Sequence, residues 1–312
     1  MYIPLHGHST FSFLEAIAHP KHIAKKAKSL ELPAIGITDL GGMYGAIAFS
    51  FAAKDEGIKP LIGVELGFVL DLKGTYLSKN IGNICLLAIN DQGYYSLMKL
   101  TSFANQEGLE GKPKIDLQIL KQWSEGILVF YGGTESWIGK MLNNGESADK
   151  IKEIHEMISS IFEERCYLEI TAQDERVISE IKPINQFILT LAGTTQTPLI
   201  VNNNFFYPEP KDKPVWEMAL SIKDNTKMYD AHRRQPAGQY HIMTEEEIKE
   251  ICLKNGYKEE QINERLKNNE NIAEQINMKI KLGQTLFPVY EAPEEIKELY
   301  EKYKDEMIVS DE

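Results

Sequence analysis

Cysteine is scarce in this 312-residue sequence, which holds only Cys85, Cys166 and Cys252. Three widely spaced cysteines argue against a disulfide framework and against a cysteine-based zinc site, and they suit a reducing compartment. Long hydrophobic runs are missing too, because we find no N-terminal signal and no apolar stretch of about 18 residues that would span a membrane. We therefore expect a cytoplasmic protein with no membrane partner.

Basic residues are also scarce relative to acidic ones. Lys and Arg number 34 against 46 Asp and Glu, which gives a formal net charge of -12 and an isoelectric point of about 5.2. Such a surface as a whole repels phosphate backbones. We therefore do not expect this chain to bind nucleic acid on its own.

Hydrophobic residues make up 43% of the chain, enough to bury a full core. Short apolar runs alternate with segments whose apolar residues recur at helical spacing. Continuous apolar strands between helices are typical of a parallel sheet covered by helices, and their number indicates a barrel related to the eight-stranded kind. A doubly wound open sheet is the alternative. The expected strands are 2–8, 33–39, 60–65, 83–89, 126–131, 166–170 and 198–201, and the expected helices are 20–32, 43–56, 94–104, 147–162 and 175–191.

Two histidines, His6 and His8, follow an apolar run that begins at Tyr2. Residues i and i+2 of a strand point to the same face, so both imidazoles can reach one metal ion. Asp39 and Glu65 stand at the ends of later strands, and strand ends form the site in a barrel. The pattern predicts a cluster of two histidines and a carboxylate. The alternative is that the histidines are surface or hydrogen-bonded groups and the carboxylates are turn or cap residues.

Three motifs carry a resemblance to a known family. They are His6-Gly7-His8-Ser9-Thr10, the segment 34–39 followed by Met43-Tyr44-Gly45-Ala46, and the segment 57–65. They are similar to the polymerase and histidinol phosphatase (PHP) domain, and most closely to the version that begins the α subunits of bacterial replicative DNA polymerase III. Segments 238–242 and 269–282 resemble that version too, so the resemblance covers most of the chain.

The resemblance implies a distorted TIM-like (βα)7 barrel of the PHP type with a C-terminal helical extension. The PHP domain would occupy residues 1–282, with a barrel core of about 1–208 and a helical extension over 209–282. Residues 283–312 would then be a linker toward a palm domain that is absent from this sequence. Polymerase chemistry needs closely spaced aspartates, and the chain has no Asp-x-Asp pair. We therefore expect no primer extension by this chain.

Metal-dependent members of this family resemble one another in a trinuclear centre with nine ligands. His6, His8 and Glu65 match three of the nine, and Glu15 stands where the family usually has aspartate. The five lost ligand positions are Leu40, Asn83, Gly133, Asn204 and Phe206.

These losses decide what the resemblance implies for chemistry. Three of the replacements have no ligating side-chain atom, and an asparagine offers only a neutral amide oxygen. We therefore expect no catalytic residue and no cofactor. The alternative is one weakly held divalent ion, Zn²⁺ or Mn²⁺, at His6, His8 and Glu65, with Glu15 close enough to assist.

Three functions follow from the resemblance. The first is the PHP module of a polymerase α subunit, a nucleotidyltransferase of DNA replication, that stabilises the polymerase and docks the proofreading exonuclease subunit. Its partners would be the remainder of the α subunit and the exonuclease, and it would meet DNA only through the full polymerase. The second is a residual metal-dependent phosphoesterase, of 3'-5' exonuclease or pyrophosphatase type, that uses His6, His8 and Glu65. The third is a free-standing phosphatase of the histidinol-phosphate type, which the segment 238–282 disfavours.

Overall fold

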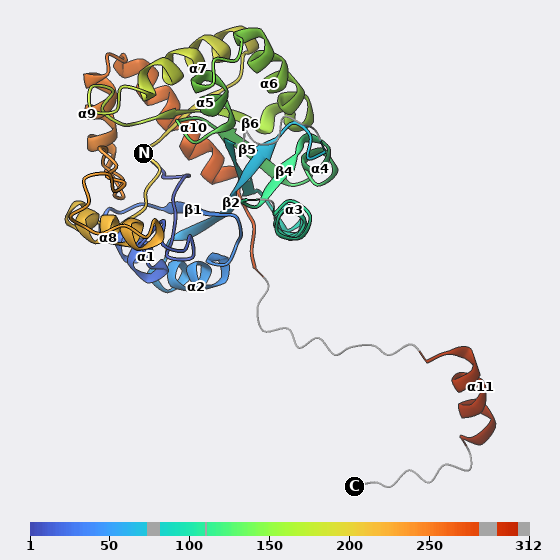
Figure 1. The fold of residues 1–312 in the computed structure, drawn as a ribbon. Helices are drawn as coiled ribbons and strands as arrows, with labels where there is room; N and C mark the ends of the chain where they lie inside the picture. The colour runs from blue at the N-terminus through green and yellow to red at the C-terminus, as the bar shows by residue number, and fades with distance from the viewer. Residues whose placement is uncertain (74–81, 110, 281–291, 305–312) are drawn as a thin grey trace. The chain divides into compact units, whose positions relative to one another are not determined.

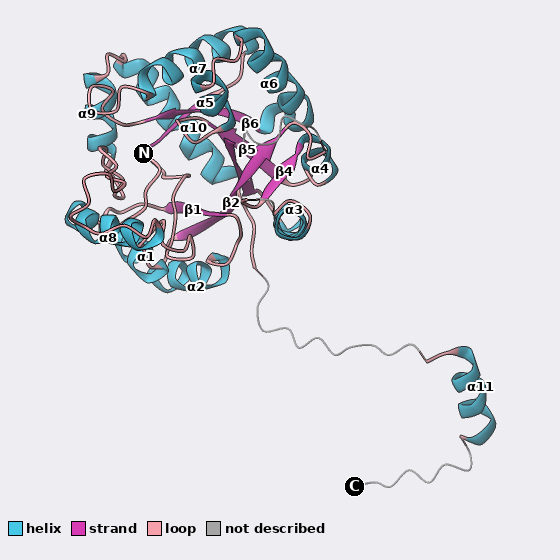
Figure 2. Cartoon of the chain, viewed as in Figure 1, coloured by secondary structure: helices cyan, strands magenta, loops and turns pink. Residues whose placement is uncertain are grey.

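The computed structural model describes residues 1–73, 82–109, 111–280 and 292–304. The chain divides into two compact units, Met1–Ile280 and Lys281–Glu312. The first unit is an α/β fold with its strands in the interior and its helices around them (Figure 1, Figure 2). In the second unit the described residues form one helix, α11 (Glu294–Tyr303). Two parts of the predicted linker, 283–291 and 305–312, lie outside the described residues.

Seven strands form one curled sheet in the order β1-β2-β3-β5-β6-β7, and the short β4 pairs with β2 beside this path. The strand residues are almost all buried, because helices cover the outer face and side chains fill the inner one. This explains why the strands read as unbroken apolar runs. The strands are β1 (Ala34–Leu40), β2 (Lys59–Val69), β3 (Gly82–Ala88), β4 (Lys114–Asp116), β5 (Ile127–Tyr131), β6 (Cys166–Thr171) and β7 (Leu199–Asn202).

One strand departs from the predicted parallel arrangement. β3 runs antiparallel to both of its neighbours, β2 and β5, while the other pairs are parallel. The prediction of a wholly parallel sheet is therefore wrong at β3. A strand that is buried on both faces shows the same apolar run in either direction, so the sequence pattern carries no sign of the reversal. The coarser prediction, an α/β sheet covered by helices, is confirmed.

The N-terminal segment 4–8 fills the gap between the two ends of the sheet. On the β1 side, the Gly36 amide donates to the Pro4 carbonyl at 2.7 Å. On the other side, the His8 amide donates to the Phe205 carbonyl at 2.8 Å, just beyond the end of β7. The predicted strand at residues 2–8 is thus an extended segment with one isolated bridge, and the named strands make a partial barrel.

Most helices lie where the sequence predicts them. α1 (Pro20–Ser29) begins at the expected proline, and α2 (Ala46–Glu56) ends before Gly57, whose φ of 74° lies in the left-handed region that glycine adopts without strain. α7 (Ile181–Thr195) begins later than predicted. β4, α4 and α5 are too short to show a periodicity, so the sequence did not reveal them. The other helices are α3 (Asp91–Gln106), α4 (Leu117–Gln122), α5 (Trp137–Asn143), α6 (Ala148–Phe162), α8 (Lys213–Lys223), α9 (Glu245–Lys254) and α10 (Glu259–Gln275).

Helix α10 supports the segment that carries the two histidines. Its buried Asn269 donates to the carbonyls of Ile3 and Val201, at 2.9 Å and 2.8 Å, and accepts from the Val201 amide at 3.1 Å. One amide side chain therefore joins α10, β7 and the N-terminal segment. Among the helices in the described ranges, none is long and apolar enough to cross a membrane.

A buried polar network lies between α6 and the sheet. His155 places its Nδ1 2.8 Å from the Tyr131 hydroxyl and its Nε2 2.8 Å from the Thr197 hydroxyl. Burial lowers the pKa of His155 to about 4. The imidazole is therefore neutral at physiological pH, and hydrogen bonds alone hold the network together.

This network predicts a specific dependence of stability on pH. The folded pKa of His155 lies below the ordinary value of 6.5, so the unfolded chain binds this proton first as the pH falls. The contribution of His155 to the unfolding free energy is complete above pH 6.5 and falls by up to about 3 kcal/mol as the pH approaches about 4. We predict that His155→Gln, which does not titrate, loses stability less steeply over this range in urea unfolding. His22→Gln, at an exposed position of α1, is the control, and equal pH slopes for His155→Gln and wild type would contradict the prediction.

Candidate metal centre

Strands β2 and β3 together present a small set of side chains to the mouth of the sheet. Their pairing places Glu65 opposite Cys85 and Gly67 opposite Asn83. In each strand these positions are two residues apart, so all four face the same side. Together with His6 they line a cavity of about 590 Å³. The antiparallel pairing of β3 with β2, in this register, therefore brings Cys85 and Asn83 to Glu65.

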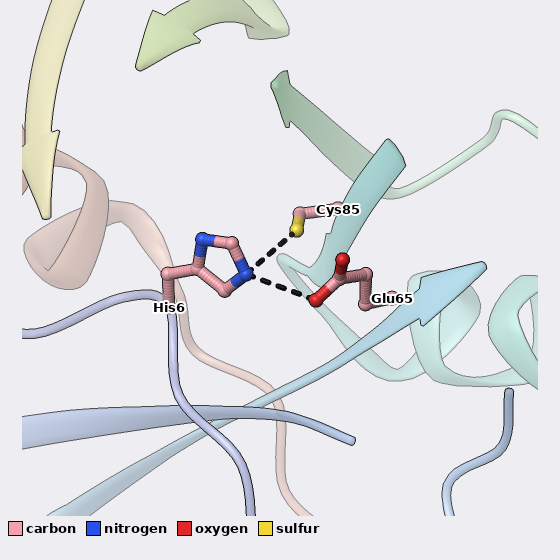
Figure 3. A group of neighbouring side chains, drawn as sticks. All are labelled: His6, Glu65 and Cys85. Atoms are coloured by element: carbon pink, nitrogen blue, oxygen red, sulfur yellow. Dashed lines mark hydrogen bonds and ion pairs between the residues drawn. The ribbon is translucent and has the colours of Figure 1, made fainter. Parts of the chain in front are cut away.

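His6 lies between two buried glutamates. Its Nε2 is 3.0 Å from Glu65 Oε2 and 3.4 Å from Cys85 Sγ (Figure 3). Its Nδ1 is 3.0 Å from Oε2 of Glu169, which comes from β6 and also accepts from the Asn202 amide at 3.1 Å. His6 and both glutamates are at most 5% exposed. A protonated imidazole can therefore donate to a carboxylate on each side.

The Glu65 carboxylate accepts hydrogen bonds from three side chains. Its Oε2 lies 2.7 Å from His8 Nε2 and 3.0 Å from His6 Nε2. Its Oε1 accepts a short hydrogen bond from the side-chain amide of Asn83. The protein itself thus satisfies both oxygens of Glu65.

The charge states of the cluster follow from burial and these contacts. Burial alone raises the pKa of Glu65, but the hydrogen bonds from His6 and His8 outweigh it and hold the pKa well below its usual range. Burial acts to lower the pKa of His6, whereas Cys85 and Glu169 more than offset this and raise it well above the ordinary value. Burial raises the pKa of the Cys85 thiol to about 12. At physiological pH the cluster therefore combines the Glu65 carboxylate, the His6 imidazolium and the neutral Cys85 thiol.

Phe206, at a position where the family resemblance leads us to expect a ligand, extends an aromatic stack from His8. The His8 and Phe206 rings are stacked with centroids 4.5 Å apart, and Phe206 stacks in turn on Trp216 of α8 at 5.4 Å. His8 is fully buried, and its Nδ1 has no hydrogen-bond partner within the described part of the chain. The phenyl ring supplies packing at this position and offers no ligating atom.

Two predicted carboxylates lie outside the cluster. Glu15 pairs with Lys223 at 2.5 Å and with Arg234 at 2.9 Å, and these three side chains line the same cavity. Asp39 accepts from the Ser9 amide at 2.7 Å and from the Ser12 hydroxyl at 2.8 Å. Asp39 thus serves as a cap for the loop that follows the histidines, and Glu15 forms ion pairs with two cationic side chains.

The remaining predicted positions surround the cavity. Leu40, Gly133 and Asn204 line it, together with Asn83 and Phe206. Leucine, glycine and phenylalanine carry no side-chain atom that binds a metal. The Oδ1 atom of Asn204 is buried and has no hydrogen-bond partner among the described residues. The structure therefore brings His6, His8, Glu65 and Asn83 together, and leaves the other predicted positions at the walls.

These residues do not fit a centre of three ions, because leucine, glycine and phenylalanine stand at three of the expected ligand positions and Glu15 is already paired. They do fit one ion. His6, Glu65 and Cys85 each offer a ligand atom, and these atoms all lie within 4.8 Å of one another. Imidazole, carboxylate and thiolate are a set of ligands that suits zinc. Binding would require His6 and Cys85 each to lose a proton and Glu65 to exchange hydrogen bonds for a metal bond.

Sequence reasoning missed three residues of this site. Cys85 follows Asn83 by two positions, and this spacing in a strand places both on one face. Glu169 is an acidic residue within an otherwise apolar run, a signal that could have found it. Lys112, whose Nζ lies 2.6 Å from Asn83 Oδ1, comes from a loop and has no such signal.

Comparisons with known proteins agree with the resemblance that the motifs carry. A family model described as "PHP domain" matches residues 4–173. DNA polymerase III subunit alpha of Helicobacter pylori is 30% identical over 258 residues, which are 79% of this chain and 21% of that protein. The same subunit of Thermus aquaticus is 29% identical over 253 residues, which are 78% of this chain and 20% of that protein. The chain thus spans about a fifth of the length of the curated relatives that it matches.

Solved structures match this chain at lower sequence identity than these relatives do. An amidohydrolase from Chromobacterium violaceum, solved with bound sulfate and no metal, has a TM-score of 0.44 and 14% identity, and the match covers 67% of this chain and 88% of that one. Histidinol phosphate phosphatase from Lactococcus lactis, complexed with zinc, L-histidinol and phosphate, has a TM-score of 0.33 and 15% identity, with 72% of this chain and 94% of that one covered.

The hydrogen bonds of Glu65 predict a large effect of removing its charge. We expect Glu65→Gln to lower the unfolding free energy by about 3 kcal/mol, because His6 and His8 lose their shared carboxylate in a buried site. Glu15→Gln is the matched control, since its partners are partly exposed and its loss costs at most about 1 kcal/mol. Urea unfolding at neutral pH measures both. Equal losses in the two variants would show that the Glu65 cluster does not stabilise the fold.

Proposed function

The chain belongs to the PHP domain family, and from this premise we propose that it is the PHP module of a bacterial replicative DNA polymerase. In this role it is a structural and docking part with a degenerate metal site, and it has no polymerase activity by itself. Its similarity to DNA polymerase III α subunits over about four fifths of its length supports the assignment. The parent protein would be a nucleotidyltransferase that acts in DNA replication.

One observation carries the proposal of a degenerate site. The carboxylate that would hold a cation, Glu65, instead accepts hydrogen bonds from His6, His8 and Asn83. Glu15, the other predicted acidic ligand, is held by two cations. A site whose negative charge is already neutralised attracts clustered metal ions only weakly. The two-metal clamp of a phosphoesterase is therefore not available to this chain.

The proposed function includes an architecture and partners. Residues 1–282 would be the PHP domain, with a TIM-like (βα)7 barrel core over about 1–208 and a helical extension over 209–282. The N-terminal segment that fills the gap between β1 and β7 supports the barrel, and α8, α9 and α10 support the extension. Residues 283–312 would lead to the palm. The partners would be the rest of the α subunit and the proofreading exonuclease.

A second candidate, a residual phosphoesterase, rests on the cluster of His6, Glu65 and Cys85. A single Zn²⁺ or Mn²⁺ would supply Lewis-acid activation of a phosphoryl oxygen when bound. Glu169 would orient the His6 ring through Nδ1, as carboxylates do for metal-bound histidines. His8, 2.7 Å from Glu65, would hold the carboxylate in place.

The proposal predicts docking without catalysis. We expect the purified chain to form a complex with the proofreading exonuclease subunit of the same source, measured by size-exclusion chromatography with light scattering. Hydrolysis of bis-p-nitrophenyl phosphate and of p-nitrophenyl phosphate, with zinc or manganese added, should not exceed that of His6→Ala/His8→Ala. The double variant, whose folding is checked by thermal unfolding, should still bind the exonuclease, because we place the docking surface outside the cavity.

Two results would count against this function. The absence of any complex would contradict the docking role. Metal-dependent hydrolysis that the double variant loses would favour the residual phosphoesterase, and would leave the family assignment intact.

A further inference from the structure

Lys112 is a cationic side chain that reaches the hydrogen-bond network of His6, His8, Glu65 and Asn83 from the loop before β4. Its Nζ donates to Asn83 Oδ1 at 2.6 Å, and the Asn83 amide in turn donates to Glu65 Oε1. The ammonium group is therefore joined to the Glu65 carboxylate through one side-chain amide. All three residues line the cavity.

The fold provides a path for this lysine across strand β2. Lys112 lies just before β4, which pairs with β2 so that Lys114 is opposite Gly67. Gly67 is also the partner of Asn83 on the other side, in β3. A Cβ atom built on Gly67 would lie 3.3 Å from Lys112 Cε and 3.0 Å from the Pro113 carbonyl. The missing side chain at Gly67 is thus what lets the lysine stem pass over the strand to Asn83.

Asn83 is a suitable link between the two charges. Its amide group donates to the carboxylate with nitrogen and accepts from the ammonium with oxygen, so both halves are used. A histidine at this position, as the family resemblance would have it, would offer a lone pair to a metal ion. The asparagine instead accepts a hydrogen bond from the Lys112 ammonium and donates one to the Glu65 carboxylate, and so holds the two charges near each other. Burial lowers the pKa of Lys112 below its ordinary value, and the negative charges of Glu65 and Glu135 partly offset this.

We propose that the Lys112 ammonium is a built-in counter-charge that takes the place of a divalent cation at Glu65 and keeps such an ion out of the His6, Glu65 and Cys85 cluster. The ammonium bonds to Asn83, the same amide that bonds to the Glu65 carboxylate, and a divalent cation at Glu65 would be repelled by this positive charge. This inference rests on the proposed function, since it explains how a degenerate PHP site remains stable in the absence of metal. It makes Lys112 a positioning residue for Glu65 and not a ligand.

The test measures metal affinity in variants of the full chain. We expect Lys112→Met to bind Zn²⁺ at least roughly tenfold more tightly than wild type, in competition with a chromophoric chelator at neutral pH. Lys112→Arg keeps the charge and should bind as weakly as wild type. Lys140→Met is the matched control, because Lys140 pairs with Glu135 and not with Asn83 or Glu65 among the described contacts. The gain of Lys112→Met should disappear when His6→Ala is added.

The outcomes separate this inference from the proposed function. Unchanged zinc affinity in Lys112→Met, or an equal gain in Lys140→Met, would overturn the role of Lys112. If wild type also binds one zinc ion tightly, the degenerate site fails as well; if wild type binds weakly, only the inference about Lys112 fails. Thermal unfolding in the presence of a chelator checks that each variant is folded, and Lys112→Gln replaces Lys112→Met if the latter is not.

Discussion

The buried carboxylate of Glu65 is the constraint on which the rest of this site depends. A carboxylate that is 4% exposed is costly unless its charge and both oxygens are satisfied. In a metal centre, bound cations would meet that need. Here the same need is met by two histidines from the N-terminal segment and an asparagine from β3. The site is thus organised around a negative charge that the protein neutralises with its own groups.

The fold explains why these groups meet. The N-terminal segment fills the gap between β1 and the end of β7, and this fixes His6 and His8 over the mouth of the sheet. β3 runs antiparallel to β2, and their pairing places Cys85 opposite Glu65 and Asn83 opposite Gly67. Glu169 reaches the other side of His6 from β6. Each contact comes from a different stretch of the chain, so the buried charges of Glu65 and His6 are fully satisfied only when all of these segments pair.

Most strands and helices and three residues of the site could be predicted from the sequence. The direction of β3 and the contact of Lys112 could not. The apolar runs and the proline and glycine at helix ends gave most strands and helices, because burial and capping leave local signals. The direction of β3 leaves none, since a doubly buried strand looks the same both ways. His6, His8 and Glu65 stood out by residue type and spacing. Lys112 did not, because its role depends on the absence of a side chain at Gly67 in another strand.

The most direct test of the account is anomalous X-ray scattering from crystals of the chain grown with excess zinc. The account predicts no anomalous peak at His6, Glu65 and Cys85, with the Glu65 carboxylate still between the two imidazoles. A strong peak among these three side chains, with the Glu65 oxygen withdrawn from His8 to bind the ion, would contradict it. That result would make the cluster a working metal site and not a self-neutralised remnant of one.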